Sequence, residues 1–428
     1  GLKRDHLARL AAPAVASRMK DALRMDAYLL DWANLLLRWL HVIVAIAWIG
    51  SSFYFVFLDS NLLAPTADDL KAKGVDGAMW AVHGGGFYNP QKYLVAPKGG
   101  IDSKLHWFYW ESYSTWLSGF ALFAVLYLWN ASAFLVDRQV LDWSPVAAGF
   151  TAVGFLVAFW FIYDAICRVF GFRPHGERIV AALLIVVVAF ASWLACHLFA
   201  GRAAFLIVGA MLATAMSANV FFWIIPGQRK VVAAMTSGQP YDADALAIHG
   251  RRGKQRSVHN TYFTLPVLIA MLSNHYGFLT SHPRRWLVLC LLMAAGALIR
   301  QFFVQRHGWH HGRARHPWPF AAAGVLVLLG LIAWMKPAPV PASAALPASV
   351  GYAQIAPVLA ERCVSCHGEA VQMKNLRLDS QAQVEQHAQL IYQQVVVSRI
   401  MPLSNGTHMT DAERALVARW FEGRGRAP

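Results

Sequence analysis

The chain has 428 residues, of which 57% are hydrophobic and only 14% are charged. Soluble globular proteins are nearer about 25% charged, so this composition excludes a disordered, collagen-like or ordinary cytosolic protein. The net charge of +15 could suggest a nucleic-acid partner. Basic loops beside apolar segments usually record membrane orientation instead, so we expect contact with membrane lipid and no nucleic acid. The composition favours a polytopic membrane protein with room for one small extra domain.

Residues 1–24 form a basic segment that precedes the first apolar run. The segment begins with Gly1 and lacks the charge, short apolar core and small-residue cleavage site of a signal peptide. A tag remnant, or a mis-assigned start upstream of Met25, would account for it. We therefore expect the first folded domain to occupy residues 25–336.

Eight apolar runs follow, and each is close to the roughly 20 residues that a membrane-spanning helix needs. Open sheets cannot span lipid, and the alternating pattern of a β-barrel is missing. We therefore predict an all-α fold, with an eight-span helical bundle followed by a small second domain. The expected spans are Trp32–Leu58, Leu105–Trp129, Pro145–Cys167, Ile179–Ala200, Ala203–Ile225, His259–Leu279, Trp286–Val304 and Trp318–Met335.

The orientation follows from the basic residues of the short loops, which gather on the cytoplasmic side of membrane proteins. With the amino terminus outside, the inner loops hold most of the Lys and Arg residues of the domain. The outer loops hold only Arg138, Arg202, Arg284 and Arg285. Both termini are therefore expected outside, which is the periplasmic side of a bacterial inner membrane.

A Pro/Ala-rich linker, residues 337–350, leads to a second domain over residues 351–428. This domain opens with Cys363-Val364-Ser365-Cys366-His367, the C-x-x-C-H motif that attaches a c-type haem. In such a motif the two thiols bind the haem vinyl groups, and His367 ligates the iron. A zinc site would need two further ligands, and no second Cys pair follows. We therefore predict a cytochrome c domain with covalent haem c.

The sixth ligand of this haem is expected to be a downstream Met. Met401 follows a helical run over Gln381–Ile400, on the kind of loop from which small cytochromes c present their Met. Met409 directly precedes a capping box, Thr410-Asp411-Ala412-Glu413, that predicts the last helix. Met373 lies close to the haem Cys residues and would need a tight return. We predict Met401 as the ligand.

Ionisable residues inside spans indicate functional sites by default. His41 lies well inside the first span, on one helical face with Ala45 and Trp48, and Arg38 lies one turn away. His41 followed by Trp48-Ile49-Gly50 resembles the first span of HemJ-type haem b proteins. This resemblance implies a possible haem b, with His41 as one iron ligand and His197 or His275 as the other. A hydrogen-bonded structural His is the alternative.

A second group of polar residues lies at the inner ends of the spans. His83 precedes three glycines, which allow a backbone to approach a ligand closely. His106 and Glu111 open the second span, and His259 and Asn260 open the sixth. Anchoring at the interface or hydrogen bonding along a helix could account for each residue alone, but their convergence at one membrane face indicates a binding site.

Three stretches resemble the bacterial membrane-bound urate oxidase of the PuuD type. They are His83–Tyr88, His106–Trp116 and His259–Pro266. The resemblance covers essentially Met25 to the end and implies an eight-span domain followed by cytochrome c. It also implies oxidation of urate to 5-hydroxyisourate without hydrogen peroxide. The electrons would leave through haem c to a soluble or membrane cytochrome or a terminal oxidase.

The chemistry of a purine anion agrees with this resemblance. A planar anion requires aromatic walls, cationic or amide donors, and a base for its ring N–H. The candidate catalytic residues are Glu111, His106, His259 and Asn260, and the candidate substrate-binding residues are His83, Trp110, Arg252, Arg256 and Thr264.

Two other functions stay open at this stage. A quinol–cytochrome c oxidoreductase would place a quinone head group in the inner pocket. A non-enzymatic electron-transfer subunit of a respiratory complex would turn over no substrate alone. No flavin or nicotinamide motif is present, so electrons are expected to leave singly.

Overall fold

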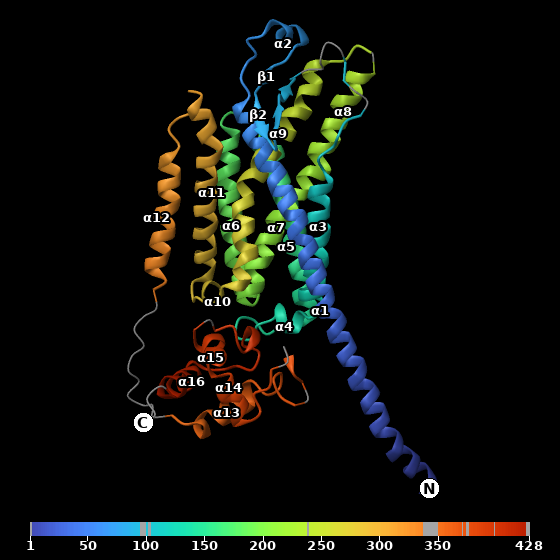
Figure 1. Cartoon of the computed structure of the whole chain (residues 1–428), viewed down its shortest axis with the longest axis vertical. Coiled ribbons are helices and arrows are strands. Elements are labelled where there is room, and N and C mark those ends of the chain that lie inside the picture. The colour runs from blue at the N-terminus through green and yellow to red at the C-terminus, as the bar shows by residue number, and fades with distance from the viewer. Residues whose placement is uncertain are drawn as a thin grey trace.

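The computed structural model describes residues 2–94, 100–101, 104–237, 239–336, 350–369, 371–373, 376–397 and 399–424, with side chains from Tyr28 onward. The side chains of the basic segment 1–24, and the linker 337–350 apart from Val350, lie outside the described residues. Between these limits the chain forms a long helical bundle and a smaller helical domain, as Figure 1 shows.

Five described helices are long and apolar enough to cross a membrane, by length and composition. They run side by side along the long axis of the molecule (Figure 1). They are Tyr28–Asn61 within α1 (Leu2–Asn61), α5 (Pro145–Phe170), α6 (Gly176–Leu198), the continuous stretch Gly201–Thr236 and α11 (Arg285–His310). The stretch Gly201–Thr236 comprises α7 (Gly201–Asn219), the π-helical segment η2 (Val220–Ile224) and α8 (Ile225–Thr236).

The remaining three expected spans are helical, but the count of eight spans is not confirmed. Leu105–Trp129 forms α3 (Trp110–Phe123) and the π-helical segment η1 (Ala124–Leu128), and Trp318–Met335 forms the shorter α12 (Trp318–Trp334). His259–Leu279 is divided among the second half of α9 (Ala243–Leu272), η3 (Ser273–His275) and α10 (Gly277–Thr280). The polar first half of α9 extends the helix and lowers its mean hydropathy, so apolar runs alone misplace its start.

The helix α7 is the centre of the bundle. About 61% of its apolar window is buried, against 28–33% for α5, α6 and α11 and none for α1. Small residues allow this close packing: a Cβ atom on Gly209 would lie 2.8 Å from the Cβ of Ala270 on α9. The outer helices expose large apolar side chains such as Phe150, Ile185 and Val186. In a membrane these faces would meet lipid.

Two short antiparallel ribbons depart from the all-α prediction. One pairs β1 (Gly77–Ala78) with β4 (Gln91–Lys92), and the other pairs β2 (Ala81–His83) with β3 (Gly86–Tyr88). Gly84 and Gly85 form the turn between β2 and β3 with φ angles of 59° and 81°, which favour glycine. Together with α2 (Asp68–Lys73), the ribbons cap the end of the bundle that faces away from the C-terminal domain (Figure 1).

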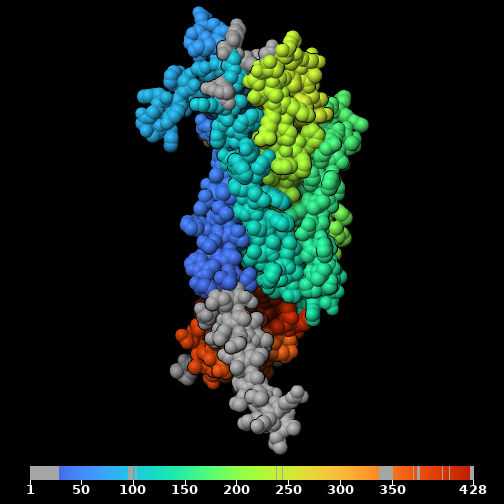
Figure 2. Space-filling view, turned by 90° about the vertical axis from the view of Figure 1, so that its right-hand side faces the viewer, coloured from blue at the N-terminus to red at the C-terminus, as the bar shows by residue number. Residues whose placement is uncertain are grey.

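The C-terminal domain lies against the other end of the bundle, as Figures 1 and 2 show. Its contact includes η6 (Leu403–Asn405) against α4 (Ala131–Phe134). The expected helical run Gln381–Ile400 is broken at His387. The helices of this domain are α13 (Tyr352–Arg362), α14 (Gln381–Gln386), α15 (Ala388–Ile391), the π-helical η5 (Tyr392–Val397) and α16 (Asp411–Gly423).

The predicted capping box at the start of α16 is confirmed. The Thr410 hydroxyl accepts from the Glu413 amide at 3.2 Å, and the Glu413 carboxylate accepts from the Thr410 amide at 2.6 Å. Arg362 of α13 donates to the same carboxylate at 2.9 Å and 3.1 Å. The cap therefore joins the first and last helices of the C-terminal domain.

This cap should give α16 a pH-dependent stability. Partial burial raises the pKa of Glu413, but hydrogen bonds from Arg362 and Thr410 outweigh it, so the pKa lies below its ordinary value of 4.5. A carboxyl whose pKa is lowered on folding contributes stability that is lost as the pH falls through its folded pKa. Amide-exchange protection factors of α16 should stay constant near neutral pH and fall below 4.5. Glu413→Gln should be less protected at neutral pH and lose most of this dependence; an identical pH profile in the variant would contradict the assignment.

Candidate active site

A chain of hydrogen bonds crosses the core of the bundle. Asn219 at the end of α7 donates through Nδ2 to the Tyr163 hydroxyl on α5 at 2.9 Å. The Tyr163 hydroxyl lies 2.9 Å from Nδ1 of His259 on α9, and His259 Nε2 lies 3.4 Å from Glu177 on α6. With the proton of His259 on Nε2, the Tyr163 hydroxyl donates to Nδ1 and the donors all point toward Glu177. We call these four residues the relay.

The relay begins in the dry interior and ends at the surface. Tyr163 and Asn219 are fully buried, and His259 is nearly so, whereas the Glu177 side chain is 60% exposed. Glu177 lies at the start of α6, at the end of the bundle opposite the C-terminal domain (Figure 1). The arrangement can therefore move a proton from the core to that surface.

Asn219 has a second set of contacts where α7 changes to the π-helical η2. Its Nδ2 also donates to Oδ1 of Asn260 at 2.8 Å, and Asn260 donates to the Met216 carbonyl at 3.0 Å. The Oδ1 atom of Asn219 is buried and has no hydrogen-bond partner among the described residues. π-helical segments are frequent at functional sites, because they re-aim side chains within a helix.

A buried ion pair lies beside the relay. Arg256, which is only 3% exposed, donates from Nη2 to Asp164 at 2.6 Å. Asp164 also accepts from Trp223 at 2.8 Å and pairs with Arg168 at 2.6 Å. The Arg256 guanidinium lies 4.8 Å from the ring centroid of Tyr163. Its Nη1 atom is buried without a hydrogen-bond partner in the described part of the chain, so it can donate to a ligand.

A cavity of about 210 Å³ opens next to this ion pair. It is lined by Cys167, Arg168, Phe172, Trp223, Arg252, Gln255 and Arg256. Two of these residues touch the relay: Cys167 Sγ lies 3.8 Å from His259 Nδ1, and Gln255 donates to Glu177 at 2.7 Å. The cavity therefore combines cationic donors, aromatic walls and a route for protons, and a small planar anion is the ligand that these groups suit.

The structure brings together five of the residues singled out from the sequence. His259 belongs to the relay, Asn260 contacts it, and Arg252 and Arg256 line the cavity. Thr264 is buried one turn further along α9 and donates to the Asn260 carbonyl at 2.9 Å. It supports the site and does not line it.

Four expected residues are not part of this cluster. His83 is exposed on the β2–β3 ribbon, and His106 is exposed with its ring against Phe108. Trp110 is 63% exposed, and neither the cavity lining nor the relay includes Glu111. They lie at the same end of the bundle as the site. However, α3 packs mainly on α1, so these residues do not contact the site although they lie at a similar depth.

Sequence reasoning missed most of the partners of His259. Tyr163 and Glu177 contact His259 from α5 and α6, and Asn219 of α7 reaches it through Tyr163, so these partners come from helices far apart along the chain. One signal was present: Asp164 is an acidic residue inside an apolar span, and such residues usually have a buried partner.

Of the three residues considered for haem b, His41 and His197 lie on different parts of the bundle, and His275 is exposed on η3. His41 Nδ1 lies 3.1 Å from the Thr115 carbonyl and 3.1 Å from the Ser118 hydroxyl on α3. His197 is exposed on α6, and its Nδ1 lies 2.7 Å from the Trp193 carbonyl. α1 packs on α3 and α11, whereas α6 packs on α5, α7 and α11. The structure does not bring the two rings together. A carbonyl on Nδ1 is nevertheless the usual partner of a metal-binding His.

The C-x-x-C-H motif follows α13 in the C-terminal domain. Cys363 is buried in the core of this domain, Cys366 is exposed, and Nδ1 of His367 is buried without a partner among the described residues. Met401 packs on the edge of the core, and its carbonyl accepts from Arg414 at 2.8 Å. Met409 is 2% exposed and fills the core itself, whereas Met373 is exposed. Packing in the core of the C-terminal domain therefore accounts for Met409 without a role as a haem ligand.

A bundle of membrane-length helices around a buried Tyr–His–Arg cluster with its own cavity is compatible with a helical membrane protein that has a binding site within its bundle. Residues 27–336 match the family model described as urate oxidase N-terminal, and the chain belongs to this family. The match ends where α12 has ended, before the C-terminal domain. Comparisons with curated proteins and with solved structures give no match.

Breaking the buried ion pair should destabilise the bundle. Asp164→Asn leaves Arg256 as an uncompensated buried charge, and such a change costs about 3 kcal/mol of unfolding free energy. Asp142→Asn is the matched control, because Asp142 pairs with Arg138 at 3.6 Å on the surface, where ion pairs contribute under about 1 kcal/mol. Thermal unfolding of both variants in the same detergent checks this. Equal midpoints would mean that the buried pair carries no special stability.

Proposed function

We propose that the membrane domain oxidises urate to 5-hydroxyisourate and passes the electrons to a haem c in the C-terminal domain. Membership of the urate oxidase N-terminal family supports urate as the substrate. The observation that carries the placement of the site is the unpartnered Nη1 of Arg256, which is buried beside the 210 Å³ cavity. A buried guanidinium nitrogen without a partner is costly, and an anionic ligand would satisfy it.

The residues of the cavity have distinct roles in this proposal. Arg256 and Arg252 bind the anionic oxygens of urate, and Trp223 and Phe172 provide flat apolar walls. Urate monoanion and water yield 5-hydroxyisourate, two electrons and one proton. Cys167 and Gln255 connect the cavity to the relay, so His259 and Glu177 accept the proton and release it at the surface.

The C-terminal domain would accept the electrons. Cys363 and Cys366 would hold the haem, and His367 and Met401 would ligate its iron. Cys363 and Cys366 are free thiols, and Met401 lies at the edge of the core and does not fill it, so these residues fit this donor set. When bound, haem c accepts one electron at a time, which suits a protein that produces no hydrogen peroxide. A cytochrome or terminal oxidase would take the electrons onward.

Covalent haem is attached on the outer side of bacterial membranes, so this proposal places the C-terminal domain in the periplasm and the bundle in the inner membrane. The Glu177 end of the relay would then face the cytoplasm. Three arginines line the cavity and favour an anion over a neutral quinone head group, which argues against a quinol-oxidising enzyme.

Distance makes a further redox centre reasonable. His259 lies thirteen residues before the end of α9, or about 20 Å from the end that faces the C-terminal domain at ~1.5 Å per residue. We propose a haem b on His41 as the redox centre between the cavity and haem c. The contact of His41 Nδ1 with the Thr115 carbonyl is of the kind that orients a metal-binding His. The exposed His197 does not supply the opposite ligand in this geometry.

Anaerobic addition of urate to the purified full chain tests the function. The haem spectrum should change to the reduced form, and quinol should not replace urate. His259→Gln breaks the relay and should slow the reduction about 100-fold, as expected for loss of a proton acceptor. His249→Gln, three turns earlier on α9, is the matched control and should reduce at the wild-type rate. No spectral change with urate would reject the proposal.

Haem content is a separate prediction. A pyridine haemochrome assay should find one covalent haem c per chain, which the double variant Cys363→Ala, Cys366→Ala should lose. A second, extractable haem that disappears in His41→Ala would establish haem b. A single c-type haem in the wild type would exclude it, and a covalent haem in the double Cys variant would overturn the assignment of the motif.

A further inference from the structure

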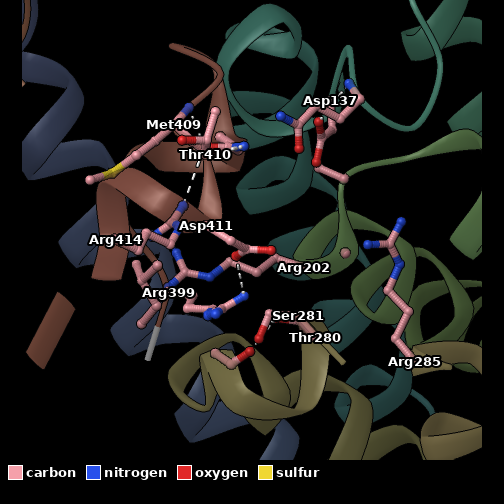
Figure 3. Close-up of a pocket in the computed structure, with 16 residues that line it drawn as sticks. Asp137, Arg202, Thr280, Ser281, Arg285, Arg399, Met409, Thr410, Asp411 and Arg414 are labelled. Carbon is pink, nitrogen blue, oxygen red and sulfur yellow. Dashed lines mark hydrogen bonds and ion pairs between the residues drawn. The ribbon is translucent and has the colours of Figure 1, made fainter. Parts of the chain in front are cut away.

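A second, larger cavity lies between the bundle and the C-terminal domain. Its volume is about 460 Å³. Figure 3 shows Arg399, Asp411 and Arg414 of the C-terminal domain on one side and Asp137 and Arg285 of the bundle on the other, with Arg202 between them. Neither the relay nor the C-x-x-C-H motif contributes to the lining. On the C-terminal side the cavity borders the Met401 loop, because Arg414 of the lining donates to the Met401 carbonyl.

Four arginines but only two carboxylates line this cavity. On the C-terminal side Arg399 pairs with Asp411 at 2.9 Å. Arg414 donates to three neutral oxygens of its own domain, so its donors are engaged within that domain. Asp137 is the one carboxylate that the bundle contributes to this lining; burial raises the pKa of its carboxyl above the ordinary value, and Arg285 opposes that rise.

Neither arginine of the bundle side forms an ion pair with another described residue. Arg285 donates to the Cys196 carbonyl at 2.8 Å, which satisfies a hydrogen bond but supplies no negative charge. Arg202 is half-buried, and no hydrogen bond or ion pair joins it to another described residue. Partly desolvated cations of this kind are costly unless an anion pairs with them.

The positions of these arginines are unusual for a membrane protein. By the loop charges, this end of the bundle carries only four basic loop residues, and Arg202 and Arg285 are two of them. The other two, Arg138 and Arg284, do not line the cavity. The other basic loop residues of the bundle lie on the opposite side of the expected membrane. The presence of Arg202 and Arg285 together in one cavity therefore indicates that they bind something there.

Neutral donors complete the surroundings. Thr280, Ser281 and Thr410 add hydroxyl groups to the lining, and α7 begins at Gly201 without a side-chain cap. The N-terminus of a 19-residue helix adds a partial positive charge. Two guanidinium groups, several hydroxyls and a helix N-terminus are together typical of sites that bind phosphate groups.

We propose that this cavity binds a phosphate-bearing anion, held by Arg202 and Arg285, which joins the C-terminal domain to the bundle. The phosphate can come from the headgroup of an anionic phospholipid, since the cavity lies at one end of the membrane-length helices, or from free phosphate. The bound anion neutralises the bundle side of the junction, so it stabilises the docked position of the C-terminal domain. This proposal does not depend on urate being the substrate.

The test uses the full chain, purified and stripped of lipid. Inorganic phosphate is titrated by calorimetry, and retention of phosphatidylglycerol against phosphatidylcholine is compared by native mass spectrometry. Arg202→Gln and Arg285→Gln should each weaken binding about tenfold, as expected for loss of one charge-assisted hydrogen bond. Arg284→Gln is the matched control, because Arg284 is the exposed neighbour of Arg285 outside the cavity, and it should bind as the wild type does.

The two arms of the test separate the sources of phosphate. Saturable binding of inorganic phosphate supports a free-anion site, and selective retention of phosphatidylglycerol without phosphate binding supports a lipid headgroup. The proposal is overturned if neither probe binds, or if both cavity variants bind as tightly as Arg284→Gln. Cross-linking between η6 and α4 supplies a second measurement: the anion should increase it in the wild type and leave it unchanged in Arg202→Gln.

Discussion

The pairing of Arg256 with Asp164 is the interaction on which the rest of the membrane domain depends. It joins α5 to α9 within the apolar bundle, where either charge alone would be costly to bury. It also holds the guanidinium over Tyr163 and beside Trp223, so that one nitrogen is engaged and another is free. Tyr163, placed in this way, is within hydrogen-bond distance of both Asn219 and His259. One ion pair thus fixes the cavity and orders the relay.

Helix packing around α7 makes this arrangement possible. The small residues of α7 bring α5 and α9 close, and the change to a π-helix at its end turns Asn219 toward both neighbours. The same helix begins at the junction with the C-terminal domain, where Gly201 and Arg202 line the second cavity. A single buried helix therefore connects the two ends of the bundle, with polar chemistry at each end and an apolar middle.

The two cavities differ in how their cations are balanced. In the core, Asp164 compensates Arg256 and Arg168, and one guanidinium nitrogen is left for a small ligand. At the junction, Asp411 pairs with Arg399, and neither bundle arginine forms an ion pair with another described residue. The first arrangement suits binding of one planar anion. The second suits a phosphate group that meets two domains at once.

Local patterns in the sequence determined much of this protein. Apolar runs indicated membrane-length helices, and Thr410 with Glu413 predicted the start of α16, because such signals act between residues that are neighbours along the chain. The stretch around His259 also indicated chemistry. Tertiary packing alone decided which residues surround His259: Tyr163 and Glu177 contact its ring from two other helices, and Asn219 of a third contacts Tyr163. It also separated Glu111 and His106 from the site, because the sequence sets the depth of a residue in the membrane but not the side of the helix bundle on which it lies. Contacts between distant helices depend on which faces fit together, and no local pattern encodes that fit.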